Sequence, residues 1–431
     1  MKLSVVGSGY VGTTISACFA ELGHDVTAID IDQEIVDSLN QGQASLYEPG
    51  LDDLLAEHIA DRLTATTDYG VIPETEATFL ALPTPSRADG SIDTSIILAA
   101  AESVGEALAD STDQHLVVTK STVTPGTTED EIRPAVRTAA GDQTGRISFG
   151  MNPEFLREGT AVDDFLNPDK IVLGTDEGDQ WAAETLEAVF EPLIEQTDTP
   201  VVRTGIREAE IIKYANNAFL ATKISLINEL GNICKEYDVD AYEVADAIGL
   251  DDRIGEQFLR SGVGWGGSCF PKDVAAIIAA ARDKGYEPEL LSAAVGVNDR
   301  QPGRMVKLLT DHVDPAGKRI AVLGLAFKPG TDDIRNSRAI PLIGSLLDLD
   351  ASVVAYDPVA TDNMRDQYPD IEYADSAAAA LVDAEGVLVV TDWPEFADLD
   401  EEFNEMATPV VIDGRRIIER RDGLVYEGLT W

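Results

Sequence analysis

Cys269 lies in a setting that could make its thiol reactive. It follows the glycine-rich segment Gly264-Trp265-Gly266-Gly267-Ser268 and precedes Pro271, a residue that suits the first turn of a helix. A helix N-terminus favours the thiolate, which is the nucleophilic form of cysteine. Asp273 comes four residues later and would project to the same side one turn on. A lone cysteine is most often a small buried hydrophobe, but glycines and polar neighbours argue against that role here.

Further polar residues have spacings that could serve a reaction. Lys213 and Asn217 lie four residues apart in a stretch with helical apolar spacing, so their side chains point the same way. A lysine on a helix is usually a solvated surface residue, whereas an asparagine inside an apolar stretch is less usual. Glu154 and Glu158 are also four residues apart, and an exposed helix start is the alternative for that pair. Thr122 follows a predicted strand, and strand C-termini face the ligand crevice in open α/β sheets.

The N-terminus carries a glycine pattern that predicts a dinucleotide site. Gly7, Gly9 and Gly12 follow a short apolar strand and lead into a helix. The first glycine permits a tight turn, the second lets the backbone approach a pyrophosphate, and the third lets the helix pack on the strand. Asp30 ends the next strand, where a carboxylate binds the adenosine ribose and repels a 2'-phosphate. This context favours NAD over NADP and over a glycine turn without a ligand.

Alternating apolar strands and helical stretches predict an α/β fold with parallel strands joined by helical crossovers. The N-terminal strands are predicted at 2–6, 26–30, 77–82, 116–120 and 170–174, with helices at 13–22, 93–108 and 180–190. Residues 207–237 predict one long helix, in which Gly231 is the weak point, and more helix follows to about residue 312. A second α/β pattern has strands predicted at 319–323, 352–356, 386–391 and 409–412. We therefore predict three domains, 1–205, 206–314 and 315–431.

The composition excludes several classes of protein. The chain has 78 acidic and 32 basic residues, a net charge of -46 that would repel nucleic acid and anionic lipid. The acidic residues are spread along the whole chain, which favours adaptation to multimolar salt over an ordinary acidic cytosolic protein. No apolar run approaches the roughly 18 residues of a membrane helix, and the N-terminus does not look like a signal peptide, so we expect a cytoplasmic protein. Three cysteines without a C-x-x-C pair and four scattered histidines predict neither disulfides nor a metal site.

Ten segments in order give the chain a resemblance to the UDP-glucose/GDP-mannose dehydrogenase family over nearly its whole length. They are the glycine turn 7–12, YEPGL (Tyr47 to Leu51), PTP (Pro83 to Pro85), KST (Lys120 to Thr122), NPEFLREG (Asn152 to Gly159), KYANNAF (Lys213 to Phe219), RIGEQFL (Arg253 to Leu259), GWGGSCFPKD (Gly264 to Asp273), FKPGTDDIR (Phe327 to Arg335) and DGR (Asp413 to Arg415). The resemblance implies an N-terminal Rossmann domain that binds NAD, a long central helix that forms a homodimer interface, and a C-terminal Rossmann-like domain that helps bind a UDP-sugar.

The resemblance also implies the site residues. The predicted catalytic residues are Cys269 as nucleophile with Lys213, Asp273, Asn217, Glu158, Glu154 and Thr122 around the sugar C6. The predicted cofactor-binding residues are Gly7, Gly9, Tyr10, Val11, Gly12, Asp30, Thr84, Thr122, Glu158, Lys272 and Arg335. The predicted substrate-binding residues are Phe155, Leu156, Arg157, Lys213, Asn217, Arg253, Phe258, Gly266, Phe327, Lys328 and Arg415, of which Arg253 would reach the substrate of the neighbouring subunit.

The activity that the resemblance implies is a four-electron oxidation of a nucleotide sugar from alcohol to carboxylate. Cys269 would trap the intermediate aldehyde as a thiohemiacetal, which a second oxidation turns into a thioester. Either Glu154 or Glu158 would then activate the hydrolytic water. The segments favour UDP-glucose as substrate, with GDP-mannose as the alternative. Two rival hypotheses are a dehydrogenase that stops after one oxidation and a binding protein without activity.

Overall fold

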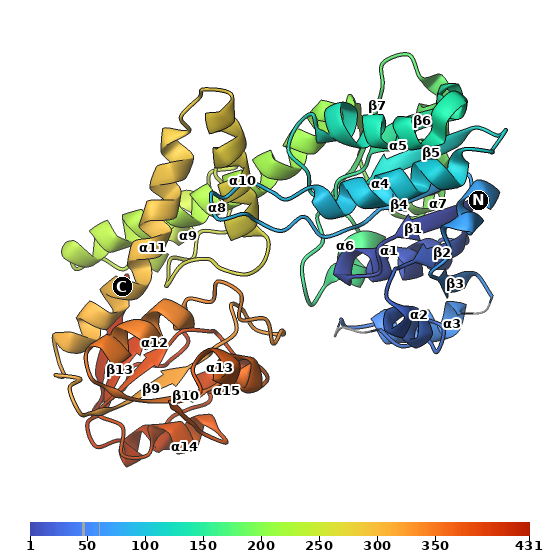
Figure 1. Cartoon of the computed structure of the whole chain (residues 1–431). Helices are drawn as coiled ribbons and strands as arrows, with labels where there is room; N and C mark the ends of the chain where they lie inside the picture. The colour runs from blue at the N-terminus through green and yellow to red at the C-terminus, as the bar shows by residue number, and fades with distance from the viewer. Residues whose placement is uncertain (45–47, 60) are drawn as a thin grey trace. The chain divides into compact units, whose positions relative to one another are not determined.

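The computed structural model describes residues 1–44, 48–59 and 61–431, without the side chains of 142–144, and divides the chain into two compact units, 1–216 and 217–431 (Figure 1). Tyr47, the first residue of the YEPGL segment, lies outside the described residues. No helix in the described part of the chain is both long and apolar enough to cross a membrane. The predicted three-domain division stays a prediction.

The described part of the first unit contains a sheet of eight strands in the order β3-β2-β1-β4-β5-β6-β7-β8. The strands are β1 Lys2–Val6, β2 Asp25–Ile29, β3 Leu63–Thr66, β4 Ala77–Leu80, β5 His115–Thr119, β6 Ile147–Met151, β7 Ile171–Thr175 and β8 Val201–Thr204. The α-helices are α1 Tyr10–Glu21, α2 Gln33–Leu39, α3 Leu51–His58, α4 Ser95–Leu108, α5 Arg133–Ala140, α6 Ala161–Leu166 and α7 Gln180–Thr197. Short 3-10 and π segments are η1 Tyr69–Glu74, η2 Thr128–Ile132 and η3 Gly141–Arg146.

The expectation of parallel strands throughout needs one correction. β1 to β6 are parallel and have the strand order of a doubly wound Rossmann fold, but β7 pairs with β6 antiparallel. The chain from β6 to β7 holds only the six-residue α6, so β7 starts from the sheet edge where β6 ends. Three further strands, β3, β6 and β8, were not predicted from the sequence. Of these, β8 is half exposed and lacks a continuous apolar run.

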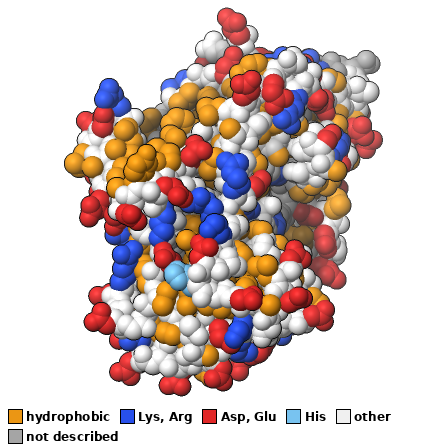
Figure 2. All heavy atoms as spheres, turned by 90° about the vertical axis from the view of Figure 1, so that its left-hand side faces the viewer, with side chains coloured by type: hydrophobic (Ala, Val, Ile, Leu, Met, Phe, Trp, Pro, Cys, Tyr) orange, Lys and Arg blue, Asp and Glu red, His pale blue; other side chains and the backbone are white. Residues whose placement is uncertain are grey.

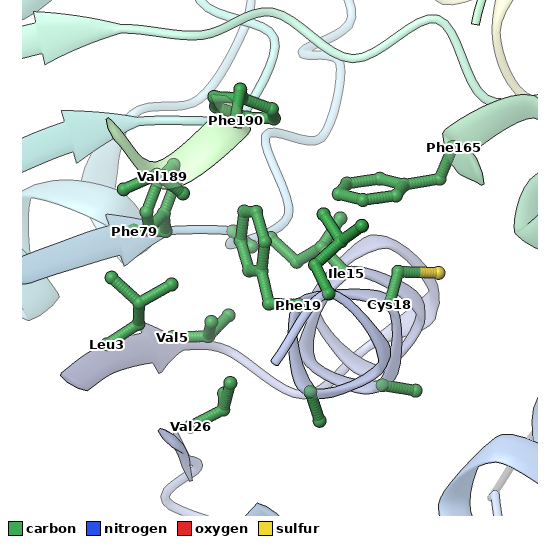
Figure 3. Close-up of a cluster of buried hydrophobic side chains, with 14 of the residues drawn as sticks. Leu3, Val5, Ile15, Cys18, Phe19, Val26, Phe79, Phe165, Val189 and Phe190 are labelled. Atoms are coloured by element: carbon green, nitrogen blue, oxygen red, sulfur yellow. The ribbon is translucent and has the colours of Figure 1, made fainter. Parts of the chain in front are cut away.

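Aromatic side chains make the centre of the first unit's core. Phe19 of α1 lies 4.9 Å from Phe79 of β4, 5.3 Å from Phe165 of α6 and 5.8 Å from Phe190 of α7, measured between ring centroids (Figure 3). Cys18 is fully buried beside them, and this burial raises the pKa of its thiol. Cys18 is therefore a small core residue of the first unit. These contacts fix α1, and therefore the glycine turn before it, on the sheet.

A polar network crosses the same sheet at His115. Its Nδ1 lies 3.0 Å from the carbonyl oxygen of Thr75, which can only accept, so Nε2 accepts from the Thr78 hydroxyl at 2.7 Å. Burial lowers the pKa of His115 to about 4, because the charged ring would lose its hydration, although the hydrogen bond to Thr75 opposes this shift.

We expect this network to weaken the fold in acid. The folded pKa lies below the unfolded value, so the contribution is fully present above about pH 6.5 and is lost as the pH falls towards about 4. A shift of this size corresponds to about 3 kcal/mol in the free energy of unfolding. Denaturant unfolding at several pH values should show this loss in the native chain and a shallower pH dependence in His115→Asn. Parallel pH profiles for the two proteins would contradict the assignment.

The second unit combines a helical layer with another sheet. Its helices before the sheet are most of α8 Ile206–Glu236, then α9 Ala241–Gly249, α10 Phe270–Asp283 and α11 Glu289–Thr310. The later helices are α12 Ala339–Asp348, α13 Thr361–Gln367, α14 Ala377–Leu381, α15 Pro394–Ala397 and the 3-10 segment η4 Glu401–Glu405. The strands are β9 Arg319–Leu323, β10 Ser352–Tyr356, β11 Glu372–Tyr373, β12 Gly386–Val389, β13 Val410–Asp413 and β14 Val425–Gly428.

The second sheet has the order β11-β10-β9-β12-β13-β14 in the described chain, and its neighbouring strands are all parallel. Ile320 and Val322 face a core with α11 and α12, while Ala321 and Leu323 face another with α14 and α15. Both faces are therefore covered, as a doubly wound sheet requires. The predicted fold class, two Rossmann-type sheets and a long central helix, is confirmed.

The long helix α8 accommodates Gly231 because another segment passes close to it. A Cβ at this position would lie 2.8 Å from the Ser261 hydroxyl oxygen and 2.8 Å from the Thr430 Cβ. The predicted weak point of the helix is thus a packing requirement. Cys234, further along α8, is half buried, in contrast to the fully buried Cys18.

Acidic side chains are scattered over the face shown in Figure 2, with hydrophobic side chains gathered in one part of it. This distribution agrees with the expectation, drawn from the sequence, of an acidic surface without a single acidic tail.

Candidate active site

The glycine turn after β1 is shaped for close approach of a ligand. A Cβ at Gly7 would lie 2.6 Å from the Ala81 carbonyl oxygen, and a Cβ at Gly12 would lie 1.8 Å from the Gly7 carbonyl oxygen. Among the described residues, nothing lies within 4 Å of a Cβ at Gly9, so the backbone there faces open space at the N-terminus of α1. The Ser8 N–H donates to Asp30 at 2.6 Å, which holds this carboxylate beside the turn. The arrangement fits a pyrophosphate at the helix N-terminus and a ribose at Asp30.

Two loops that follow neighbouring strands are bonded to each other next to this turn. The Thr84 hydroxyl after β4 donates to the Thr122 carbonyl oxygen after β5 at 2.8 Å. The Leu82 N–H donates to the Ser121 hydroxyl at 2.7 Å. The structure thus brings the predicted residues Thr84 and Thr122 together at the carboxyl ends of the strands, where ligands bind in such sheets.

A buried ion pair joins two of the predicted catalytic residues. Lys213 Nζ lies 2.7 Å from Glu154 Oε1, and the two side chains are 3% and 9% exposed. Glu154 also accepts the N–H of Leu156 at 2.8 Å. Burial alone would raise the pKa of Glu154, but the charge and hydrogen bond of Lys213 outweigh it, so this pKa lies below its usual value. Glu154 is therefore a charged partner that orients the Lys213 ammonium.

A second buried lysine supports this pair, and the sequence analysis did not single it out. Lys120 Nζ donates to the Asn152 Oδ1 at 2.6 Å, and Asn152 donates to the Val172 carbonyl oxygen at 2.9 Å. Burial lowers the pKa of Lys120 to about 8, although the charge of Glu154 opposes this shift. Lys120 thus fixes the segment that leads into Glu154. The signal for it was a lysine directly after β5, whose centre Leu116-Val117-Val118 is apolar.

The remaining residues of the NPEFLREG segment have different surroundings. The ring of Phe155 lies 4.2 Å from Lys170 Nζ and 5.7 Å from Lys213 Nζ, measured to its centroid. Leu156 is buried in the core, whereas Arg157 is exposed and forms a bidentate ion pair with Asp164. Phe155 is thus next to the buried ion pair, and Arg157 is held on the surface.

Cys269 is confirmed at the start of a helix, where it is the N-cap of α10. It is half buried, and its Sγ lies 3.5 Å from the Ser268 hydroxyl oxygen. Its carbonyl oxygen accepts the N–H of Asp273 at 2.9 Å, so Asp273 lies one turn along. The Asn217 amide donates to Asp273 Oδ2 at 2.6 Å, and Lys272 Nζ lies 3.2 Å from Asp273 Oδ1. The thiol, a buried carboxylate and an amide are therefore gathered at this helix end.

Buried polar groups hold the loop before Cys269 in place. Asn298 accepts the Trp265 N–H at 2.8 Å and donates to its carbonyl oxygen at 2.9 Å. The Trp265 indole donates to the Ser225 hydroxyl of α8 at 3.0 Å. A Cβ at Gly266 would lie 2.2 Å from the Asn336 carbonyl oxygen, so this loop also packs closely on the segment after β9.

The segment after β9 brings Phe327 to the same loop. A Cβ at Gly267 would lie 2.7 Å from the Phe327 ring, and the Lys328 ammonium lies 5.6 Å from the centroid of that ring. Arg415 donates to the Val390 carbonyl oxygen at 2.8 Å and to the Gly264 carbonyl oxygen at 3.4 Å. The predicted substrate residues Gly266, Phe327, Lys328 and Arg415 are thus neighbours around the loop of Cys269.

Of the other predicted residues, Arg253 and Phe258 are exposed, whereas Arg335 contacts the loop of Cys269 through its carbonyl oxygen, which accepts the Gly267 N–H at 2.9 Å. Arg253 is ion-paired with Asp251 and its side chain is 88% exposed. Arg335 is ion-paired with Asp333. Phe258 is 41% exposed and has a φ of 61°, a left-handed conformation that is uncommon for a large residue. The expectation that Arg253 reaches the substrate of a neighbouring subunit stays a prediction.

Family models match almost the whole chain. A model described as the NAD binding domain of the UDP-glucose/GDP-mannose dehydrogenase family matches residues 1–194. The models of its central domain and its UDP binding domain match residues 207–300 and 321–420.

Similar proteins cover the chain from end to end. UDP-glucose 6-dehydrogenase AglM from Haloferax volcanii is 65% identical over 100% of both chains. The structure of a UDP-glucose dehydrogenase from Pyrobaculum islandicum has a TM-score of 0.92 and 41% identity, covering 100% of this chain and 98% of the other. That of a GDP-mannose dehydrogenase from Pseudomonas aeruginosa has a TM-score of 0.57 and 29% identity, covering 100% of both.

Proposed function

The chain belongs to the UDP-glucose/GDP-mannose dehydrogenase family and is an NAD-dependent nucleotide-sugar 6-dehydrogenase. We propose that it oxidises UDP-glucose at C6 to UDP-glucuronic acid through a covalent intermediate on Cys269. The observation that carries this proposal is the cluster at the start of α10, where a half-buried thiol stands one turn before a buried carboxylate held by Asn217. The relatives named for UDP-glucose are more similar in sequence than the one named for GDP-mannose.

NAD is held by the turn of Gly7, Gly9 and Gly12 with Asp30, and when bound it takes up the hydride that leaves C6 in each oxidation. Tyr10, Val11 and Thr84 border this turn and the neighbouring loop. Asp273 accepts the proton of the C6 hydroxyl through a water molecule, and the Lys213 ammonium and the Asn217 amide stabilise the alkoxide that forms.

An aldehyde carries no hydroxyl from which a second oxidation can start, which is why a nucleophile is needed. The Cys269 sulfur bonds to the aldehyde carbon, and the carbonyl oxygen takes up a proton to give a thiohemiacetal. Loss of a second hydride and of the hydroxyl proton leaves a thioester. Water then bonds to the carbonyl carbon, the C–S bond breaks, and the carboxylate and the free thiol are released.

We propose Glu158 as the base that activates this water, because Glu154 is less suited to the task. Glu154 is bonded to Lys213 and to the Leu156 N–H, and its lowered pKa makes it a weak base. Its role is then to hold the Lys213 ammonium in the orientation in which it stabilises the oxyanion, with Thr122 nearby at the strand end.

The UDP moiety is proposed to bind around the loop of Cys269, on Gly266, Phe327, Lys328 and Arg415. In this part of the chain the Phe327 ring offers an apolar surface, and Lys328 and Arg415 supply positive charge for a diphosphate. Arg253 and Phe258 are proposed to act on the substrate of a neighbouring subunit.

A homodimer through α8 completes the proposal. This helix exposes an apolar stripe at helical spacing, with Phe219 70%, Leu226 55%, Leu230 36% and Ile233 49% exposed. Large apolar patches of this kind on a protein surface mark interaction sites, and a second copy of the chain would cover this one.

The stoichiometry of NADH formation tests the proposed function. In multimolar KCl with excess NAD, we expect about two NADH for each UDP-glucose consumed, because both oxidations occur before the product leaves. UDP-glucose and GDP-mannose should be compared at equal concentration. One NADH per sugar would indicate a dehydrogenase that stops at the aldehyde, and no NADH with either sugar would indicate a binding protein.

A further inference from the structure

A buried carboxylate in the YEPGL segment has no part in the reaction described so far. Glu48 is 5% exposed and receives three hydrogen bonds from distant segments of the first unit. Its Oε2 accepts from the Tyr10 hydroxyl at 2.5 Å and from the Gly159 N–H at 2.8 Å. Its Oε1 accepts from the Ala161 N–H at 2.7 Å. Both oxygens are therefore engaged by donors, as a carboxylate requires.

The three donors belong to two parts of the predicted site. Tyr10 is the first residue of α1, directly after Gly9 of the glycine turn. Gly159 follows Glu158, and Ala161 begins α6. One carboxylate thus connects the start of the cofactor helix with the loop that carries Glu158.

The other end of this loop is braced separately. Asp164 accepts the Arg157 N–H at 2.8 Å and the Thr160 hydroxyl at 3.1 Å. Asp164 holds the loop only to its own helix α6, whereas Glu48 holds it to α1. A longer bond, from the Tyr10 hydroxyl to the Arg157 carbonyl oxygen at 3.4 Å, also joins the loop to the turn.

The pKa of Tyr10 is affected by Glu158 as well as by Glu48. Burial raises the pKa of Tyr10 most, followed by its bond to Glu48 and the charges of Glu48 and Glu158. The phenol is therefore hydrogen-bonded to Glu48 and lies within electrostatic reach of Glu158.

We propose that Glu48 is a positioning residue that fixes the loop 157–161 against the start of α1, so that Glu158 keeps the place from which it activates water for hydrolysis of the thioester. The inference rests on the proposed function, since only a covalent intermediate needs such a base. It predicts a specific defect, in which the two oxidations proceed and the last step becomes slow.

The test is Glu48→Gln in the full chain, assayed with NAD and UDP-glucose in multimolar KCl. The amide has one acceptor and one donor, so it cannot receive all three hydrogen bonds. We expect kcat to fall about ten- to a hundredfold, as for a catalytic group displaced by about 1 Å, with little change in the KM for UDP-glucose. Slow hydrolysis should produce a burst of NADH and an adduct on Cys269 in the mass spectrum of the intact protein.

Asp179→Asn is the matched control. Asp179 accepts the Ser148 hydroxyl at 2.6 Å and the Ala182 N–H at 3.0 Å, near the other end of β6. This variant also puts an amide in place of a carboxylate that accepts hydrogen bonds from two segments, and it should keep the native kinetics. Glu48→Asp, which keeps the charge but is one methylene shorter, provides a second variant if the glutamine variant does not fold, and it should show the same burst.

The outcomes separate the inference from the proposed function. If the native chain gives two NADH per sugar and both Glu48 variants behave like Asp179→Asn, the positioning role is wrong and the function stands. A lower kcat without a burst or adduct would also overturn it, because hydrolysis would not be the step affected. If the native chain forms no NADH, the proposed function fails and the inference falls with it.

Discussion

Replacing Cys269 by alanine is expected to abolish formation of the carboxylate product. The thiol is the group that gives the aldehyde a new hydroxyl, so its loss removes the second oxidation while leaving the first possible. We expect the steady-state rate of NADH formation to fall about a thousandfold or more, the scale on which loss of a catalytic nucleophile acts. In a single turnover the variant should form at most one NADH per sugar.

The loss of the second oxidation in Cys269→Ala should not arise from misfolding of the variant. Cys269 is half buried and its side chain makes no capping hydrogen bond to the start of α10, so alanine should leave this helix end formed. The free energy of unfolding of Cys269→Ala should stay within about 0.5 kcal/mol of the native value. Cys234→Ala is the matched control, because this half-buried cysteine lies on α8 and should leave both oxidations unchanged.

The stoichiometry decides the question more sharply than the rate. Two NADH per sugar from Cys269→Ala would mean that the second oxidation does not pass through the thiol. Product analysis adds a second criterion, since UDP-glucuronic acid should be absent and the C6 aldehyde should be captured by an added amine. An unchanged yield of the acid would refute the covalent mechanism.

Features that depend on local spacing could be predicted from the sequence. The glycine turn with Asp30, and Cys269 at the start of a helix one turn before Asp273, need only neighbouring residues and the geometry of a strand or a helix. The long helix α8 was predicted to within one residue at each end, because thirty residues of helical spacing without proline leave little alternative.

Contacts between distant segments could not be read in this way. The pairs Lys213 with Glu154 and Lys120 with Asn152 join residues 59 and 32 positions apart, and only the folded sheet brings them together. Glu48 is a still clearer case, since its donors lie 38, 111 and 113 residues away. The direction of β7 was predicted wrongly for a related reason, because the direction of a strand follows from its connection rather than from its own residues.

Low salt is expected to unfold the protein. The net charge of -46 arises from 78 acidic and 32 basic residues, so most carboxylates have no cation to pair with. At about 0.1 M salt the Debye length is roughly 10 Å and neighbouring charges repel, whereas at about 1 M it is roughly 3 Å. Domain stabilities of about 5–15 kcal/mol are small enough for this repulsion to exceed them. Thermal unfolding should therefore show a midpoint that rises steeply with KCl, and activity should follow it.

A single charge change separates screening from other effects of salt. Glu102 and Glu106 are exposed, lie four residues apart on α4 and repel each other. Glu106→Lys turns them into an attractive pair near the helix C-terminus, worth about 0.5–1 kcal/mol in dilute buffer. This gain should vanish in multimolar KCl, because the ions screen the attraction as they screen the repulsion. If the gain persists at high salt, or if sucrose restores the fold in dilute buffer as well as KCl does, then salt acts by strengthening apolar burial, and charge repulsion is not what limits stability.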